Sequence, residues 1–389
     1  MPDSDAIAVL KFGGSSFIEL SDYNQVAGYL AGRVAAEGIR AVVVVSGMSG
    51  TTGRLLESAR SIDPQLQPEV QDQILATAEM ISASFLRAAL AAAGCPAIDL
   101  WASQIGIRTD RTATRARIVD IDPAPVRRAI GRYRIVVVAG GQAAHEGGRI
   151  TMLGRNSSDL TAIVLAAALG LDSCEIFSDV PGVFSADPHV VTAAAPIARV
   201  SYEQCAAMAT SGAKVLHTGS VCAAQEAGIA ILCRRLELNP GPPAAATGTI
   251  VSDTAGTTMA VVGNRRGRLL RMHDADKTNA ALTAARRASF AAVAVPDDRS
   301  VAVAAPGDAI DLQDVLREAG IATSVITGLG LVSVVAPSGR ADRRLVPLAD
   351  IDDVVRELHA RLHRAQAPNG PPPAIRRSPH SGLLAGGPR

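Results

Sequence analysis

Short runs of apolar, β-branched residues alternate with alanine-rich stretches along the first two-thirds of the chain. The apolar runs predict strands at Ile7–Lys11, Ala41–Val45, Ile135–Ala139 and Glu175–Ser178. The stretches between them predict helices over Asp22–Glu37, Ile74–Ala93 and Asp159–Leu169, with a loop over Ser46–Gly53. Because the strands are apolar throughout, we predict an α/β fold whose mostly parallel sheet is sandwiched by helices. Ligands of such sheets bind beyond the carboxyl ends of the strands.

The amino-acid composition changes at Asn239–Gly248, where the density of proline and glycine indicates a linker or an exposed loop. The segments beyond it predict a small α+β unit of ferredoxin-like order, with its last helix at Ile351–His363. We therefore expect one domain over residues 1–250, a second over 257–365, and a disordered tail rich in proline and glycine over 366–389.

Composition narrows the class of protein. A net charge of +1 argues against a dedicated binder of nucleic acid or of a membrane surface. The apolar runs are too short to predict a membrane span, and the first residues lack the pattern of a secretory signal. Five scattered cysteines without a CxxC pair indicate buried thiols in a reducing cytoplasm. His359 and His363 stand four apart, but without a third ligand a solvated helix face is the better interpretation.

A glycine-rich turn follows the first predicted strand. It reads Lys11-Phe12-Gly13-Gly14-Ser15-Ser16, which is neither GxGxxG nor a Walker A loop. Its physical chemistry still suits a phosphate, because glycines let backbone N–H groups approach an anion and a helix start adds positive partial charge. Lys11 supplies a full charge, although a turn of this kind taken alone is more often only a turn.

Further motifs follow in a fixed order. They are SGMSGTT at 46–52, AE at 78–79, VVVAG at 136–140, TMLGRNSSDLTA at 151–162, FSDVPGVFSADP at 177–188 and SGAKVLH at 211–217. With KFGGSS at 11–16, this series resembles the aspartate kinases of the amino acid kinase superfamily over about residues 7–250. The resemblance implies transfer of the γ-phosphoryl group of ATP, with Mg²⁺, to the side-chain carboxylate of L-aspartate, giving 4-phospho-L-aspartate.

The implied reaction brings one anion to another. The acceptor carboxylate, with a pKa of about 3.9, is already ionised at neutral pH, so no general base is required. Catalysis then consists of charge neutralisation and in-line positioning. The resemblance implies that Lys11 contacts the transferred phosphoryl group, that Lys214 neutralises nucleotide phosphate charge, and that Asp159 orients the ammonium groups or helps to hold the metal.

The resemblance also implies the binding residues. Arg155 would grip the α-carboxylate of the substrate and Glu79 its ammonium group, while Thr52 and Ser158 would donate hydroxyl hydrogen bonds. The implied nucleotide-binding residues are Lys11, Gly13, Gly14, Ser15, Ser46, Ser178, Asp179, Phe184 and Lys214. Each has a plain structural alternative: Arg155 could be one surface arginine among 35, and Glu79 an exposed helical acid.

Lysine usage supports a working kinase independently of the resemblance. Only three lysines stand among 38 basic residues, and two of them are Lys11 and Lys214. A chain that has exchanged lysine for arginine elsewhere keeps the compact ammonium where a phosphoryl group is expected. Lys277 has no such interpretation.

Departures from the family pattern leave alternatives open. Asn156 and Ser157 stand where the family has two glycines, which favours a different acceptor acid in a specialised pathway as the second hypothesis. Phe184 replaces a usual tyrosine and His189 a usual arginine, which motivates a third, an inactive ligand-sensing subunit. Ala78 replaces a usual glycine.

The second predicted domain matches least well. Its element order resembles one ACT domain, the module by which aspartate kinases bind regulatory amino acids and pair subunits. His273-Asp274-Ala275-Asp276 stands where a glycine turn is usual, so we predict a divergent ACT-like domain. The resemblance also implies a cytoplasmic homodimer.

Overall fold

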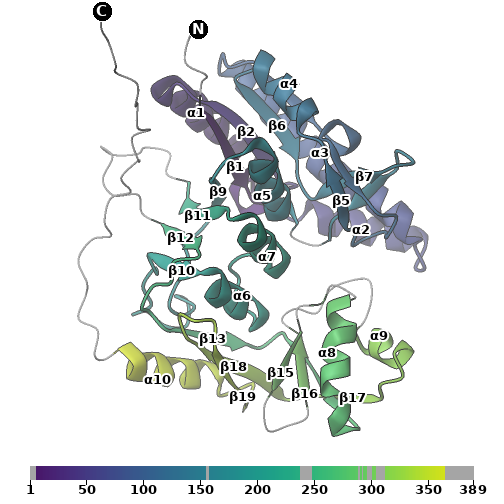
Figure 1. Ribbon diagram of the computed structural model, residues 1–389, viewed down its shortest axis with the longest axis vertical. Coiled ribbons are helices and arrows are strands. Elements are labelled where there is room, and N and C mark those ends of the chain that lie inside the picture. The colour runs from purple at the N-terminus through teal and green to yellow at the C-terminus, as the bar shows by residue number, and fades with distance from the viewer. Residues whose placement is uncertain are drawn as a thin grey trace, which may run out of the picture.

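A large sheet occupies the centre of the N-terminal part of the chain in the computed structural model, which describes residues 6–154, 157–236, 248–287, 290, 292–295, 300–303 and 312–363 (Figure 1). Its strands are β1 (Ile7–Phe12), β2 (Arg40–Val45), β3 (Ala97–Leu100), β6 (Ile135–Ala139), β9 (Ser173–Ser178), β10 (Arg199–Ser201), β11 (Ala230–Arg235) and β12 (Thr249–Ser252). They lie in the order β10-β12-β11-β9-β1-β2-β6-β3, and only the β11–β12 pair is antiparallel. The predicted parallel-rich sheet is confirmed.

Helices cover both faces of this sheet, as the apolar strands predicted. Side chains of α1 (Leu20–Glu37) and α3 (Pro68–Ala92) share one core with Leu10 and Phe12 of β1. The opposite core joins Val9 to α4 (Ala124–Arg132), α5 (Ser158–Leu169), α6 (Tyr202–Thr210) and α7 (Thr218–Ala227). Because side chains alternate along a strand, Lys11 lies on the same side as Val9 and faces α5.

The carboxyl ends of four central strands form one row. Phe12 pairs in register with Val45 of β2 and Phe177 of β9, and Val45 pairs with Ala139 of β6. The loops after these strands carry most of the motifs named above, so the register brings segments far apart in sequence to one edge.

The sequence analysis predicted four strands and three helices of the N-terminal part, and the structure adds further strands and helices to them. A small sheet is formed by β4 (Ile107–Thr109), β5 (Ile118–Ile121), β7 (Gln142–His145) and β8 (Ile150–Met152), in the order β5-β4-β7-β8. These strands are too short for a periodic pattern to emerge. The predicted loop Ser46–Gly53 was also too long, because α2 (Thr51–Ile62) begins inside it. A glycine at its third position, Gly53, conceals the start of this helix.

The C-terminal part contains two sheets, where the sequence predicted one unit. The chain order of the first is β14 (Arg268–Met272), α8 (Thr278–Arg287), β15 (Ala292–Val295), β16 (Ser300–Val303), α9 (Leu312–Glu318) and β17 (Thr323–Ile326). The second contains β13 (Ala260–Asn264), β18 (Leu329–Val335) and β19 (Ala341–Pro347), with α10 (Ile351–His363) packed on it. The sequence analysis did not predict β14 or β19, because both strands carry arginines among their apolar residues, and β19 lies at the edge of its sheet.

The predicted domain boundaries at 250 and 257 stay predictions. The predicted tail lies outside the described residues, as does most of the predicted linker.

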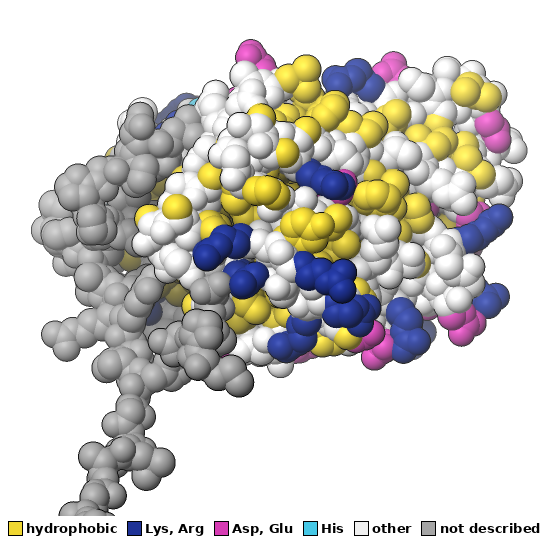
Figure 2. Space-filling model, turned by 90° about the horizontal axis from the view of Figure 1, so that it is seen from above, with side chains coloured by type: hydrophobic (Ala, Val, Ile, Leu, Met, Phe, Trp, Pro, Cys, Tyr) yellow, Lys and Arg dark blue, Asp and Glu magenta, His cyan; other side chains and the backbone are white. Residues whose placement is uncertain are grey.

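One helix has the length and composition of a membrane span. This is α3, yet ten of its residues are buried in this fold, among them the charged Asp72 and Glu79. The core helix of a soluble protein passes the same test, so α3 is weak support for a membrane. Figure 2 looks onto the end of the molecule where the chain enters β1, and several basic side chains gather there with acidic ones nearby. This end is opposite the carboxyl edge.

Candidate functional site

Lys11 and Asp159 form a buried ion pair where β1 meets the start of α5. Lys11 Nζ lies 2.7 Å from Asp159 Oδ1, and the two residues are 9% and 7% exposed. Removing either charge would leave the other buried and uncompensated. Asp159 lies in the first turn of α5, where the helix dipole favours a negative charge. The pair therefore fixes one ammonium group at the carboxyl edge of the sheet.

The glycine turn after β1 leaves room for this ammonium group. A Cβ atom on Gly13 would lie 3.2 Å from Lys11 Nζ, and one on Gly14 would lie 3.1 Å from the carbonyl oxygen of Gly47. The backbone N–H of Gly13 donates to the carbonyl of Phe177 at 3.4 Å, which ties the turn to the end of β9. Ser15 is exposed in the short 3₁₀ helix η1 (Gly14–Ser16). Small residues are therefore required here by close packing.

The helix predicted over Asp22–Glu37 is confirmed, and it begins two residues earlier, at Leu20, with Glu19 as its N-cap. Asp22 Oδ2 accepts the backbone N–H groups of Ile18 and Glu19, each at 2.8 Å. The Glu19 side chain accepts the Asp22 N–H in return, so the start of α1 is capped from within the chain. The short helix at the glycine turn itself is η1.

Ser46 and Ser158 join the loop after β2 to the start of α5. Their hydroxyl oxygens are 2.7 Å apart. Gly140, which follows β6, permits this approach, because a Cβ atom there would lie 2.6 Å from the Cβ of Ser158. Its N–H donates to the carbonyl of Val45 at 2.9 Å. Three loops of the carboxyl edge are thus held against one another beside the Lys11–Asp159 pair.

Glu79 is buried on α3 with one oxygen atom unused. It is 9% exposed, and its Oε1 accepts a long hydrogen bond from the N–H of Gly47 at 3.4 Å. Its Oε2 is buried without a hydrogen-bond partner. Burial raises the pKa of Glu79 to about 7. A buried carboxylate with a free oxygen atom is suited to accept an ammonium group from a ligand.

Thr52 and Ala78 lie beside the same backbone. A Cβ atom on Gly47 would lie 3.0 Å from the Cβ of Ala78 and 3.4 Å from the Thr52 hydroxyl. Ala78, which replaces a glycine usual in the family, therefore fits because Gly47 opposite has no side chain. Thr52, predicted on a loop, lies in the first turn of α2 instead.

Asp72 was not singled out from the sequence, yet it organises the neighbouring loop. It is 1% exposed and accepts the N–H groups of Thr114 at 2.9 and 3.0 Å and of Met152 at 3.1 Å. Burial raises its pKa to about 6, although these two hydrogen bonds act in the opposite direction. Asp72 stands seven residues before Glu79 on one helix, so helical spacing could have predicted that both acids share a face.

Ser157 folds back onto its own loop. Its hydroxyl donates to the carbonyl of Gly154 at 2.6 Å and lies 3.4 Å from that of Gly141, and the residue is 3% exposed. The extra bulk relative to the family's glycine is thus directed inward. Arg155 and Asn156 lie outside the described residues, but the segments on either side of them are anchored by Ser157 and by the Leu153 N–H, which donates to the Gly141 carbonyl at 2.9 Å.

The predicted nucleotide residues divide into two groups. Ser178 is the last residue of β9, and Asp179 and Phe184 follow it; the end of this strand adjoins the glycine turn. The Ser178 hydroxyl donates to the carbonyl of Val180 at 3.0 Å, and Asp179 is exposed. Lys214 is exposed on the loop between α6 and α7, and no described carboxylate forms an ion pair with it.

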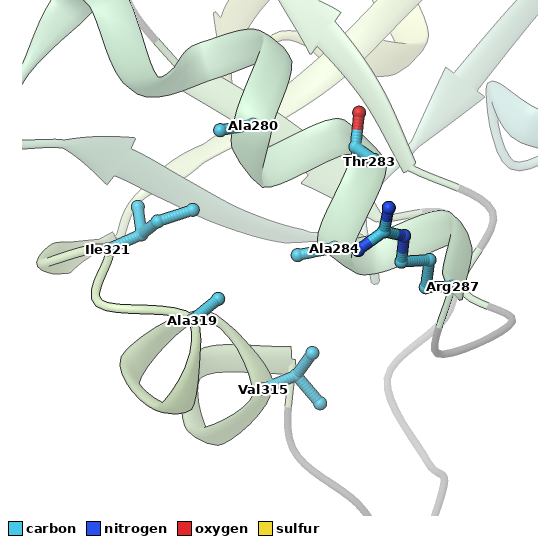
Figure 3. A pocket seen from close by; sticks show the side chains of 7 residues that line it. All are labelled: Ala280, Thr283, Ala284, Arg287, Val315, Ala319 and Ile321. Atoms are coloured by element: carbon cyan, nitrogen blue, oxygen red, sulfur yellow. The ribbon is translucent and has the colours of Figure 1, made fainter.

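Two further features lie elsewhere. His189 is exposed, and its N–H donates to Asp187 Oδ1 at 2.9 Å. An open hollow of about 560 Å³ lies between α8 and α9, where Thr283 and Arg287 are its polar lining (Figure 3). Its lining is otherwise alanine, valine and isoleucine, so it lacks the convergent polar groups of the carboxyl edge.

Comparison with known proteins assigns the family and the fold. A model of the amino acid kinase family matches residues 6–235. The aspartate kinase Ask_LysC of Stutzerimonas stutzeri is 41% identical over 216 residues, which cover 56% of this chain and 52% of that protein. The aspartokinase of Thermus thermophilus is 38% identical over 237 residues, covering 61% and 58%. The matched part of the chain therefore spans about half the length of these relatives.

Solved structures agree on the fold. E. coli aspartokinase III in complex with aspartate and ADP superposes with a TM-score of 0.70 at 22% identity, covering 92% of this chain and all of that one. The same enzyme with lysine and aspartate gives a TM-score of 0.64. At this identity the likeness establishes the architecture, including that of the C-terminal part.

Proposed function

The chain belongs to the amino acid kinase family, and on that premise we propose that it transfers the γ-phosphoryl group of ATP to the side-chain carboxylate of L-aspartate. The products are ADP and 4-phospho-L-aspartate. The observation that supports this proposal most strongly is the buried Lys11–Asp159 ion pair at the carboxyl edge of the sheet. At the same edge, Glu79 has a buried oxygen atom without a hydrogen-bond partner. Relatives at 38–41% identity that are named aspartate kinases or aspartokinases support the choice of substrate.

Lys11 is the group that stabilises the transferred phosphoryl. The attacking carboxylate and the γ-phosphoryl group are both anionic, and a fixed ammonium group lowers the cost of bringing them together. Asp159 orients that ammonium group through the 2.7 Å contact. The exposed Lys214 compensates phosphate charge on the nucleotide.

Glu79 is the receptor for the α-ammonium group of aspartate. Its free oxygen atom supplies the acceptor, and the charge of an arriving cation offsets the effect of burial that raises its pKa to about 7. Arg155 is assigned to the α-carboxylate by its place in the family motif, and Thr52 and Ser158 to hydroxyl contacts. The Ser157 hydroxyl is bonded to the carbonyl of Gly154 within its own loop. The serine that replaces the family's glycine therefore does not itself favour a different acceptor acid.

The donor set suits a Mg²⁺ ion that arrives with the nucleotide. Among the residues that the structure describes, no three His, Cys, Asp or Glu side chains are grouped so as to hold a metal. Mg²⁺ in kinases takes most of its ligands from phosphates and water, with one or two carboxylates. Asp159 is the carboxylate available for that role. When bound, the ion would neutralise charge on the phosphates of ATP.

Trapping of the acyl phosphate tests the proposal. Purified protein with ATP, Mg²⁺, L-aspartate and hydroxylamine should release ADP and form aspartyl hydroxamate. Hydroxamate from another acid in a panel, and none from aspartate, would transfer the assignment to a different acceptor. No ADP release with any acid, together with measurable ligand binding, would instead favour a sensing subunit.

We extend the proposal to a homodimer in the cytoplasm. The five cysteines are all free, which suits a reducing compartment. Light scattering coupled to size-exclusion chromatography should give twice the 40.0 kDa chain mass, and a monomer mass would contradict the dimer.

A further inference from the structure

Helix α10 closes the far side of the segment that follows β9. Ala186 and Val191 of that segment share a hydrophobic cluster with Ile351 and Val355 of α10. Arg356 on the same helix donates through Nε to the carbonyl of Val190 at 3.1 Å. The last described helix of the chain, yellow in Figure 1, therefore shapes a loop that begins at the site edge of the kinase sheet.

Ser185, next to the predicted nucleotide residue Phe184, is the centre of this contact. Its N–H donates to the carbonyl of Ala195 at 3.0 Å, and its carbonyl accepts the N–H of Val261 at 2.8 Å. Its hydroxyl oxygen accepts the N–H of Ala195 at 3.2 Å and lies 2.9 Å from Nε2 of His359. Phe184 itself forms a β-bridge with Pro196. Ser185 thus fixes the loop in three directions, one of them toward α10.

The Ser185–His359 hydrogen bond joins a hydroxyl group to one ring nitrogen of an imidazole. The hydroxyl oxygen can accept from both Ala195 and Nε2, or donate its own proton to Nε2, so the tautomer of His359 sets the direction of the bond. A neutral imidazole can make the bond in either tautomer. Burial lowers the pKa of His359, and the neighbouring His363 lowers it further, both of which favour that neutral form. His359 and Ser185 are each 3% exposed, so water does not compete for the bond.

We propose that His359 is a positioning residue for the nucleotide, holding the loop that carries Phe184 through its hydrogen bond to Ser185. The inference rests on the proposed function, because it takes residues 178–184 to contact ATP. Its consequence is that the C-terminal helix contributes to nucleotide affinity without touching the nucleotide, and that it contributes little to aspartate affinity.

Separate measurement of the two Michaelis constants tests this role. His359→Leu keeps an apolar side chain in the buried position but removes the hydrogen bond to Ser185, and the KM for ATP should rise about five- to tenfold, the worth of one buried hydrogen bond. The KM for aspartate should change less than about twofold, because Glu79 and its neighbours lie on other elements. His359→Gln, whose amide can place a donor or an acceptor near the position of Nε2, should restore the KM for ATP.

The controls separate positioning from general damage. Glu357→Gln changes an exposed side chain of α10, the helix that carries His359, and should leave the KM for ATP unchanged. Ser185→Ala should raise it as His359→Leu does, and the double variant should be no worse than the worse single one. Ser185→Ala also carries the test if His359→Leu does not fold.

Failure of the inference is distinguishable from failure of the proposed function. Suppose that the wild type is active, and that folded His359→Leu or Ser185→Ala has the same KM for ATP and the same affinity for ADP, measured by calorimetry. That result would overturn only the role of His359. Equal rises in both Michaelis constants, or additive effects in the double variant, would also overturn it. A wild type that neither binds ADP nor turns over would overturn the proposed function itself.

Discussion

At the scale of single residues, the candidate site depends on where charge is buried. Lys11 and Asp159 compensate each other, whereas Glu79 has one oxygen atom without a partner and a pKa raised to about 7. Burial of this carboxyl group without a partner destabilises the unliganded protein at the position where it would bind a cation. Stability and substrate affinity should therefore respond in opposite directions when this group is changed.

Glu79→Gln should stabilise the protein at pH 8 and leave its stability nearly unchanged at pH 4. The folded pKa lies above the ordinary value of 4.5, so the folded state retains a proton that the unfolded state loses as pH rises. The free energy of unfolding of the wild type consequently falls between about pH 4.5 and 7, by up to about 3 kcal/mol. Urea unfolding at the two pH values measures the difference.

The same variant should bind aspartate worse. Loss of the carboxylate should raise the KM for aspartate by at least about tenfold at pH 8, the scale of a hydrogen bond to a charged group. Glu57→Gln on the exposed surface of α2 controls for the loss of one negative charge. A Glu79→Gln protein no more stable than wild type at pH 8, or one with an unchanged KM, would show that Glu79 is not the ammonium receptor.

Sequence reasoning was effective where chemistry requires a particular residue type. Lys11 could be selected because lysine is rare in this chain, and the structure gives it a buried acidic partner. Asp72 was missed because its work is to hold backbone N–H groups of a distant loop, which no local pattern reveals. The inward turn of Ser157 could not be predicted either, because it depends on carbonyl groups of two other residues.

At the scale of elements, the site is a set of loops held in contact by glycines. The apolar strands predicted the sheet, and their parallel register predicted which loops would meet. The helix predicted over Asp22–Glu37 begins at Leu20, because Glu19 and Asp22 form a capping box at its start. The sequence alone does not predict how closely these loops approach one another.

Gly140→Ala should damage both stability and activity. The new Cβ atom would lie 2.6 Å from the Cβ of Ser158 and 3.0 Å from the carbonyl oxygen of Val45, so α5 or β2 must shift. We expect a loss of about 1–3 kcal/mol of stability, typical of overpacking, and a lower kcat because Asp159 moves with α5.

Gly28→Ala is the matched control for this change. Gly28 is exposed within α1 and a Cβ atom there meets nothing within 4 Å, so this variant should gain about 0.5–1 kcal/mol. Chemical denaturation measures both variants. Equal effects of the two substitutions would contradict the packing role assigned to Gly140.

At the scale of the whole molecule, the C-terminal part is docked on the kinase part at more than one place. Besides the α10 contact, the Arg115 guanidinium lies 4.3 Å from the ring centroid of Phe290, and Arg117 donates to the carbonyl of Arg287 at 2.9 Å. The sequence predicted a C-terminal unit but not its two sheets, because the charged edge strand β19 carries no apolar signature. These contacts could not be predicted, because Arg115 and Arg117 cannot be told from other surface arginines in the sequence.

Arg115→Ala should loosen this docking. Loss of a cation–π contact worth about 0.5–1 kcal/mol should lower the melting temperature by about 1–2 °C in differential scanning calorimetry. Arg111→Ala on the same loop removes only the exposed pair with Glu146 and should shift nothing measurable. Identical melting of the two variants would show that the Arg115 contact contributes nothing to docking.

The central claim is that the Lys11 ammonium group acts on the phosphoryl group transferred to aspartate, and Lys11→Arg tests it most directly. Arginine keeps the charge, but its planar fork is bulkier than an ammonium group where Gly13 leaves only close contacts, so geometry alone is altered. The hydroxamate assay should show a kcat at least about a hundredfold below wild type, with ADP affinity by calorimetry nearly retained. Wild-type turnover by Lys11→Arg, or by Lys11→Ala, would contradict the account.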